Sequence, residues 1–208
     1  MTYNMSGSVD ETLNATSTGW RAVRVSPTGE VVVRDWYLDM ALEGRAFQVR
    51  AGTITTHLTG DVEITDTAAE FCADAPTGTT ILPVYANFHI EALGGTVPIV
   101  AVKSVGAIST AGTAFVPLPL KIAGDASTSS ARVSAAGGVT VTAELATTTR
   151  RHFSGTLVSV DAPIVEWSPR TPPVLTGPAC VYVQIAATTT GPNYYGSLDF
   201  IELSSSLV

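Results

Sequence analysis

Apolar and polar residues alternate along several parts of this chain, most clearly at residues 84–92. Every second side chain there is apolar, from Val84 to Ala92, and the positions between them hold Tyr85, Asn87, His89 and Glu91. Successive side chains of a strand point to opposite faces, so this period of two predicts a strand with one buried and one solvated face. The pattern recurs at 139–145 and at 181–185, where Tyr182 and Gln184 are expected on the solvated face.

Further strands are predicted where Val and Thr are abundant, because β-branched side chains suit a pleated surface. Short turn sequences rich in Gly, Pro and Asn, such as Gly191-Pro192-Asn193, separate these ranges. The predicted ranges are Arg21–Val25, Val31–Leu38, Arg45–Arg50, Thr53–Leu58, Asp61–Thr65, Val97–Val105, Thr113–Ile122, Gly155–Val160 and Leu198–Leu203.

Helical signals are few. Thr67 and Glu70 have the spacing of a capping box, in which the hydroxyl and the carboxylate bind opposing backbone amides at a helix start. A short helix is therefore predicted from Thr67, and Asp35–Gly44 is a second, ambiguous candidate. Residues 123–136, rich in Ser, Ala, Gly and Thr, are predicted to form an exposed loop.

Together these elements predict an all-β protein, an antiparallel jelly-roll-like β-sandwich with one short helix. Residues 20–208 are expected to form a single domain, since sandwiches of roughly 200 residues commonly do. The polar residues 1–19 are expected to form an N-terminal arm.

Composition narrows the classes of protein. Of the 208 residues, 45% are hydrophobic and only 14% are charged, against roughly 25% charged in an average domain. These values exclude an intrinsically disordered chain and a long coiled coil. The net charge of −7 argues against nucleic acid as the main partner. No apolar run long enough for a membrane helix and no signal peptide is found, so no membrane association is expected.

Signatures of catalysis are missing from the sequence. It has no nucleophile elbow, phosphate-binding loop or zinc-protease motif. His57, His89 and His152 lie far apart, so they are interpreted as surface residues rather than metal ligands. We therefore expect no catalytic residues, no metal and no cofactor. Cys72 and Cys180 are either buried free thiols or a disulfide, and the sequence leaves this open.

Aromatic residues supply one binding hypothesis. Their rings could stack on sugars or contact a partner, although one member of each adjacent pair, Trp36-Tyr37 and Tyr194-Tyr195, should face the core. The candidate glycan or partner contacts are Trp20, Trp167, Tyr194 and Tyr195.

Prolines interrupt one apolar stretch. Proline cannot donate to a strand ladder, so this stretch is predicted to be an edge strand or an extended segment across a surface. Apolar segments of this kind can cover a neighbouring subunit, which makes the stretch a candidate oligomer interface. Its residues are Phe115, Val116, Pro117, Leu118, Pro119 and Leu120.

The end of the chain carries a family resemblance. Two apolar strands, Ala179–Ala187 and Leu198–Leu203, are joined by the small-residue loop 188–197. This arrangement resembles the end of jelly-roll virion proteins, and the low charge with abundant Thr, Ala and Gly is similar to phage and virus capsid, decoration or spike subunits. The resemblance implies a symmetric homo-oligomer, often a trimer, that contacts other virion proteins within a particle, and it implies no catalytic residues.

The expected function is therefore that of a non-enzymatic virion structural protein. The first alternative is a carbohydrate- or receptor-binding module of a phage fibre or spike. The second alternative is a small cupin- or glycosidase-like enzyme, since Asp161, Glu91, Glu144 and Glu166 lie in or near predicted strands.

Overall fold

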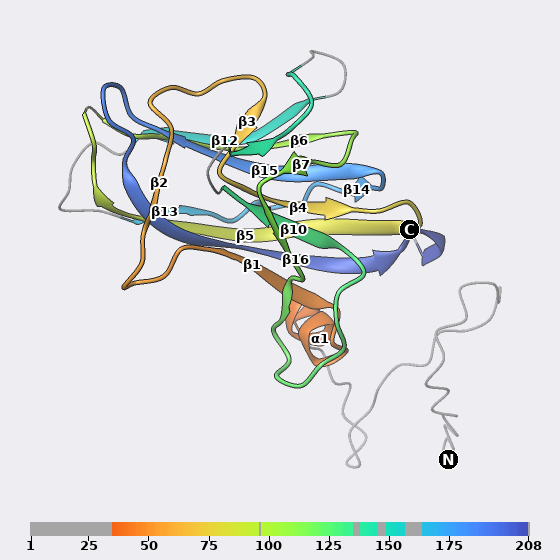
Figure 1. The fold of residues 1–208 in the computed structure, drawn as a ribbon. Coiled ribbons are helices and arrows are strands. Elements are labelled where there is room, and N and C mark those ends of the chain that lie inside the picture. The colour runs from red at the N-terminus through yellow and green to blue at the C-terminus, as the bar shows by residue number, and fades with distance from the viewer. Residues whose placement is uncertain (1–34, 96, 135–137, 145–148, 157–163, 208) are drawn as a thin grey trace, which may run out of the picture.

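The fold is seen in a computed structural model, which describes residues 35–95, 97–134, 138–144, 149–156 and 164–207. Figure 1 shows two large sheets stacked as layers, with one helix beneath the lower layer. All strand pairs within the sheets are antiparallel. The all-β sandwich with one short α-helix is thus confirmed, and the jelly-roll connection of its strands stays a prediction.

The lower layer is a seven-stranded sheet built around the longest strands of the chain. Its path is β13-β5-β16-β1-β9, with β14 beside β5 and β2 beside β16. The strands are β1 (Ala46–Ala51), β2 (Leu58–Thr59), β5 (Thr79–Ala92), β9 (Leu118–Pro119), β13 (Ile164–Trp167), β14 (Leu175–Thr176) and β16 (Asn193–Ser204).

The upper layer is a six-stranded sheet in the order β12-β6-β15-β4-β10-β8. Its members are β4 (Phe71–Ala75), β6 (Ile99–Val105), β8 (Thr113–Phe115), β10 (Ser130–Val133), β12 (Arg150–Thr156) and β15 (Ala179–Ala186). The main core lies between the two layers and includes the rings of Phe71, Phe88 and Phe200. These large rings interdigitate with Val and Leu side chains from both sheets, as sandwich packing requires.

A third, small sheet covers the outer face of the six-stranded sheet. It consists of β3 (Ala68–Ala69), β7 (Thr110–Ala111) and β11 (Val139–Thr140). Beneath it lies a second cluster of buried residues, to which Cys72, Cys180 and Tyr182 contribute. Both faces of β15 are consequently buried, and the prediction that Tyr182 and Gln184 are solvated is wrong.

Two short helical elements complete the described chain, α1 (Trp36–Leu42) and a 3₁₀ turn at Ser205–Leu207. The carboxylate of Asp35 caps α1 by accepting from the backbone amides of Tyr37 and Leu38. The second helix candidate, Asp35–Gly44, is thereby confirmed. The strand predicted over Val31–Leu38 is wrong at residues 36–38, and residues 31–34 lie outside the described part.

The helix predicted from Thr67 is also wrong. Ala68 and Ala69 form β3, and Phe71–Ala75 forms β4. Glu70 does not bind its own helix start: its carboxylate accepts hydrogen bonds from Asp61 and Tyr194 instead. The spacing of Thr67 and Glu70 fits a capping box, but the carboxylate of Glu70 instead connects other segments of the chain.

Of the other predicted ranges, some are confirmed and some are wrong. The strands predicted at 84–92, at 45–50 and at 198–203 lie within β5, β1 and β16 or overlap them closely. Asp61–Thr65 forms no strand, and Thr53–Leu58 contributes only a bridge between Thr53 and Thr56 and the first residue of β2. The loop predicted at 123–136 contains β10, which lies inside the six-stranded sheet. The predicted arm, residues 1–19, lies outside the described residues.

Candidate functional site

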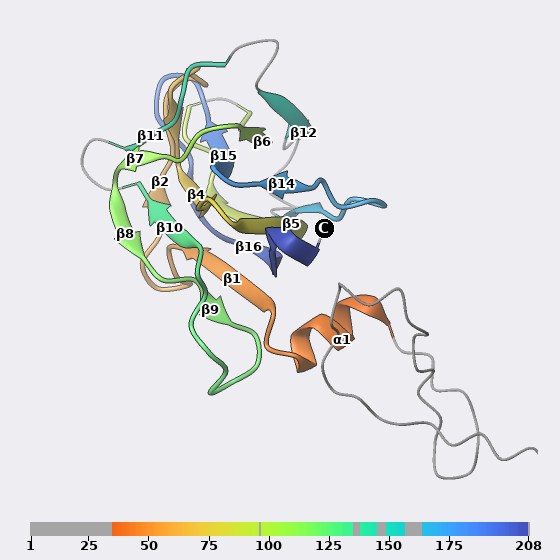
Figure 2. The same ribbon diagram turned by 90° about the vertical axis from the view of Figure 1, so that its right-hand side faces the viewer.

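The first candidate site is an apolar surface where β1 begins. Helix α1 ends four residues before β1, and β9 pairs with Phe47 and Gln48 near the start of β1. The two segments come close where Gly44 faces the side chain of Lys121. Figure 1 shows α1 and the loop that follows β9 below the seven-stranded sheet, and Figure 2 shows them on either side of the start of β1. Large apolar side chains are exposed on α1, in the segment around β9 and in the loop that follows it. Together we call them the apolar surface, and they are Trp36, Leu38, Leu42, Val116, Leu118 and Ile122.

Helix α1 turns its apolar side away from the sandwich. Tyr37 faces the sheet, and its hydroxyl donates to Oδ2 of Asp199 on β16 over 3.4 Å. Leu38 and Leu42 are separated by one helical turn and therefore share a face, and they are 51% and 49% exposed. No residue of α1 is buried. A helix whose leucines face solvent is the opposite of the usual amphipathic arrangement.

The predicted interface at 115–120 forms part of this surface. Val116 and Leu118 are exposed, whereas Pro117 is buried and Phe115 packs against the main core. Pro119 and Leu120 are half-buried. The segment is the edge strand that its prolines predict, since β9 pairs only with β1 among the described strands. That it contacts another subunit stays a prediction.

The free edges of the two large sheets are poorly suited to strand addition. β8 has three residues, β13 has four, and β9 has two, of which one is proline. β12 is longer, but it carries a bulge between Arg151 and Phe153, and both Arg150 and Arg151 are exposed. Short strands, prolines, bulges and charges are the features that keep edges from pairing with other chains.

A second candidate site is a polar depression on the outer face of the seven-stranded sheet, with a volume of about 400 Å³. Its floor is formed by polar side chains of three adjacent strands, and the turn at Gly52–Thr55 forms one side. The floor residues are held to one another: Ser197 donates to Asn87 over 3.0 Å, and Arg50 donates to Gln48 over 2.7 Å. The polar groups of the floor are therefore ordered, and the exposed side chain of Ile54 adds an apolar part to the lining.

Tyr195 lines this depression and lies among histidines. Its ring stacks on His89 with centroids 4.6 Å apart, and the ring of His57 lies 6.1 Å away. Nε2 of His57 contacts the carboxylate of Glu91. Two of the histidines interpreted as isolated thus come together around one tyrosine, because β5, β16 and the segment before β2 lie side by side. His152 is on β12 in the other sheet, where it bonds to Ser104 over 2.8 Å.

The four predicted glycan or partner contacts have different environments. Trp20 lies outside the described residues. Trp167 is 5% exposed and Tyr194 is fully buried, so neither ring offers a face to a sugar, which corrects the expectation for these two residues. Tyr195 is partly exposed. The expectation that one member of the Tyr194-Tyr195 pair faces the core is confirmed.

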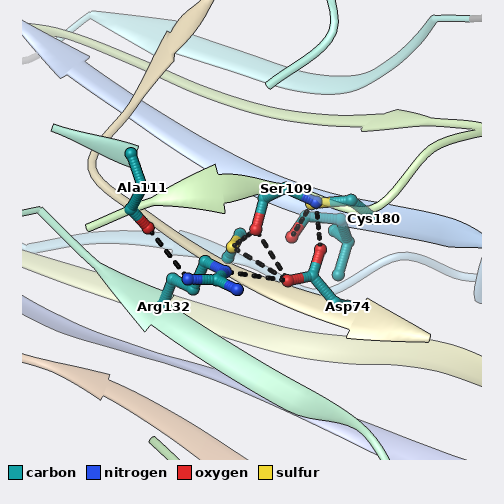
Figure 3. A network of polar contacts seen from close by, with 7 residues as sticks. Asp74, Ser109, Ala111, Arg132 and Cys180 are labelled. Carbon is teal, nitrogen blue, oxygen red and sulfur yellow. Dashed lines mark hydrogen bonds and ion pairs between the residues drawn. The ribbon is translucent and has the colours of Figure 1, made fainter. Parts of the chain in front are cut away.

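The third candidate is a buried polar cluster on the outer face of the six-stranded sheet (Figure 3). Ser109 donates its backbone N–H to Oδ1 of Asp74 over 2.7 Å and its hydroxyl to Oδ2 over 2.6 Å. Arg132 places Nε 3.8 Å from Oδ2, and it also donates to the carbonyl oxygen of Ala111. Sequence reasoning missed this cluster, because no short motif connects Asp74, Ser109 and Arg132.

The two cysteines lie in the same cluster as buried free thiols. Cys72 Sγ is 3.0 Å from Ser109 Oγ and 3.9 Å from Asp74 Oδ2. Burial, followed by the neighbouring Cys72 and Asp74, raises the pKa of the Cys180 thiol well above its usual range. Because both cysteines are free thiols, the Cys72–Cys180 disulfide that the sequence left open is not formed in this structure.

A fourth group of titratable residues surrounds Glu70, which is buried between β3 and β4. Oε1 accepts from the backbone N–H of Asp61 over 3.0 Å, and Oε2 accepts from the hydroxyl of Tyr194 over 3.1 Å. Burial, and then the charge of Asp61, raise the pKa of Glu70 to about 8. Glu70 is enclosed by the fold and links its segments, so we interpret it as a structural residue.

Comparison with protein-family models, with curated proteins and with solved structures finds no match for this chain. None of the helices in the described part of the chain has the length and apolar character needed to cross a membrane. What the protein does has therefore to be inferred from its residues and their contacts.

Proposed function

We propose that this protein is a structural subunit that assembles with copies of itself, as a capsid, decoration or spike component of a virion. The observation that carries the proposal is the outward apolar side of α1, with Leu38 and Leu42 half-exposed on one helical face. Exposed apolar surfaces of this kind are typical of protein contact sites. A symmetric oligomer covers such a surface on every subunit at once.

Because the edges of the sheets disfavour strand addition, we expect copies of the chain to contact one another through side-chain packing. The terminal strands of both large sheets are short, bulged or interrupted by proline. The apolar surface instead offers exposed Leu and Val side chains and one exposed aromatic ring, Trp36. At about 25 cal/mol per Å², burying a few hundred Å² of this surface stabilises an assembly by several kcal/mol before the costs of association.

The net charge of the chain agrees better with a role in the protein shell of a particle than with packaging of nucleic acid. A net charge of −7 does not favour packaging of nucleic acid as the main task. The expected partners are other copies of the chain, often three around one axis, and neighbouring virion proteins.

Light scattering coupled to size-exclusion chromatography tests the proposal. The full chain is expected to elute as an oligomer at micromolar concentrations. Replacing both Leu38→Gln and Leu42→Gln should shift it toward the monomer, while glutamine keeps the helix propensity of the segment. The matched control is Val62→Gln, which changes a side chain that is 52% exposed outside the apolar surface. A monomeric parent chain at high concentration would contradict self-assembly.

A second function is supported by one specific observation, the polar depression around Tyr195. A partly exposed ring beside Asn87, Gln48 and Arg50 provides a stacking face and the donors and acceptors that sugar hydroxyls require. This arrangement favours a glycan-binding role, as in a receptor-binding fibre or spike.

Glycan-array binding tests this second function. Tyr195→Ala should abolish any signal, Tyr195→Phe should retain most of it, and Trp36→Ala serves as the control for an exposed ring elsewhere. Binding that survives Tyr195→Ala, or no binding to any glycan, would count against this role.

A further inference from the structure

Neither proposed function, assembly or glycan binding, involves the buried thiols and the carboxylate of the cluster around Asp74. We propose that Cys72, Asp74 and Cys180 form a binding site for one thiophilic divalent cation, such as Zn²⁺. The three residues come from two neighbouring strands, β4 and β15. The site is independent of the proposed function in both its residues and its test.

Strand register brings the three side chains to one face of the sheet. Cys72 and Asp74 are two residues apart on β4, so their side chains point the same way. Cys180 on β15 is the register partner of Asp74. One ligand atom from each residue lies within 4.8 Å of the other two, and all three residues are buried. Figure 3 shows Cys180 beside the carboxylate of Asp74.

The spacing of Cys72 and Asp74 suits two ligands of a tetrahedral ion. Zn–S bonds of about 2.3 Å and Zn–O bonds of about 2.1 Å place a sulfur and an oxygen roughly 3.6 Å apart at the tetrahedral angle. The distance between Cys72 Sγ and Asp74 Oδ2 is 3.9 Å, a few tenths of an ångström longer. Two sulfurs and one carboxylate oxygen are a donor set that Zn²⁺ accepts in proteins.

The surroundings hold the carboxylate in place. Ser109 donates to both oxygens of Asp74, which fixes the orientation of the carboxylate as outer-shell partners do at metal sites. The hydroxyl of Ser109 is also 3.0 Å from Cys72 Sγ. The Ser109 hydroxyl therefore lies beside two of the three proposed ligands.

Charge is balanced when the cation is bound. Binding of M²⁺ displaces one proton from each thiol, which leaves two thiolates and one carboxylate around the ion. Their three negative charges are neutralised by the cation and by the guanidinium of Arg132, which lies beside Asp74. Neutrality matters here because an uncompensated charge in a buried site costs several kcal/mol.

Burial sets the way in which the ion enters. The small third sheet covers the site, and Val139 and Tyr182 pack beside the two cysteines. The cation is therefore captured while the chain folds, and it is retained afterwards.

The direct test measures metal in the unaltered chain. The full chain is refolded with Zn²⁺ or Co²⁺, freed of unbound ions, and analysed by elemental mass spectrometry and absorption spectroscopy. We expect one ion per chain, with sulfur-to-cobalt charge-transfer absorption and d–d bands of a tetrahedral site in the Co²⁺ sample.

Variants assign the ligands. Cys72→Ser and Cys180→Ser should each reduce the retained metal at least tenfold, and Tyr182→Phe, in the same buried cluster, should leave it unchanged. If a serine variant fails to fold, the measurement on the unaltered chain still decides. Metal below one-tenth of an ion per chain, with two titratable thiols after denaturation, would overturn the site. A Cys72–Cys180 disulfide in protein purified without reductant would overturn it as well.

Discussion

The hydroxyl of Tyr194 on β16 donates to Oε2 of Glu70, the residue before β4, so that one hydrogen bond of 3.1 Å links β16 to the segment that enters the other large sheet. Glu70 also accepts from Asp61, and its carboxyl group is almost wholly buried. Burial and the charge of Asp61 raise its pKa to about 8, well above its ordinary value of 4.5. The protonated form is therefore the one that folding favours.

The pH dependence of stability follows from this raised pKa. Between pH 4.5 and about 8 the folded chain holds a proton at Glu70 that the unfolded chain has lost. The contribution of Glu70 is fully present below pH 4.5 and is lost as the pH rises through about 8. Each unit of pKa corresponds to about 1.4 kcal/mol, so the loss is on the order of a few kcal/mol.

Glu70→Gln removes this titration, because the amide is neutral at every pH. Its carbonyl can accept from Asp61 while its amide donates to the Tyr194 oxygen. In urea unfolding from pH 5 to pH 8.5, the free energy of unfolding should fall with pH for the parent chain relative to the variant. Glu63→Gln, on an exposed residue, should parallel the parent. Parallel curves for the parent chain and Glu70→Gln would contradict the raised pKa.

A second prediction concerns Asp74 and its donor Ser109. Ser109→Ala removes one hydroxyl donor and is expected to cost about 1–3 kcal/mol, since a buried oxygen loses a partner. Asp74→Asn should cost more. In the parent chain Ser109 donates to both oxygens of Asp74, whereas the NH₂ group of asparagine cannot accept a hydrogen bond. Arg132 also loses its negatively charged partner. Asp125→Asn, on an exposed residue, is the matched control.

Chemical denaturation of single and double variants measures this coupling. The destabilisation of the double variant Ser109→Ala/Asp74→Asn should be smaller than the sum of the single effects. Additive effects would show that the two residues do not act as a unit.

A third prediction tests a close backbone crossing. A methyl group on Gly191 would stand 1.6 Å from the carbonyl oxygen of Gly60, whose N–H donates to the carbonyl oxygen of Pro192. Gly191→Ala must therefore separate two backbone segments, and we expect it to destabilise the fold by several kcal/mol or to prevent folding. At Gly106 no atom lies within 4 Å of an added methyl group. Gly106→Ala should leave the thermal midpoint nearly unchanged, and equal midpoints for the two variants would contradict the crossing.

The sequence predicts this fold best where one face of a strand is buried and the other is solvated. Along β5, Ala86, Phe88 and Ile90 are buried as the alternation predicts. Where both faces are covered, alternation carries no information about burial. β4 and β15 are buried throughout. Of the three strands that cover them, β3 and β7 have two residues each and leave no pattern, and β11 includes only the first two residues of the alternation at 139–145.

The candidate sites depend on contacts that sequence spacing does not encode. Asp74 and Ser109 are 35 residues apart, and Glu70 and Tyr194 are 124 residues apart. Segment 115–120 could be identified because proline restricts its place in a sheet. The outward side of α1 could not, since Leu38 and Leu42 in a short helix are usually expected to face a core.

Photo-crosslinking from position 36 tests most directly whether copies of the chain cover the apolar surface. A photoreactive phenylalanine analogue replaces Trp36, and chains grown in light and heavy nitrogen are mixed, unfolded and refolded together. We predict crosslinked peptides that pair a light with a heavy chain and that map to α1 or to residues 115–122. Crosslinks confined to single chains, in a sample that light scattering finds to be monomeric, would contradict the assembly.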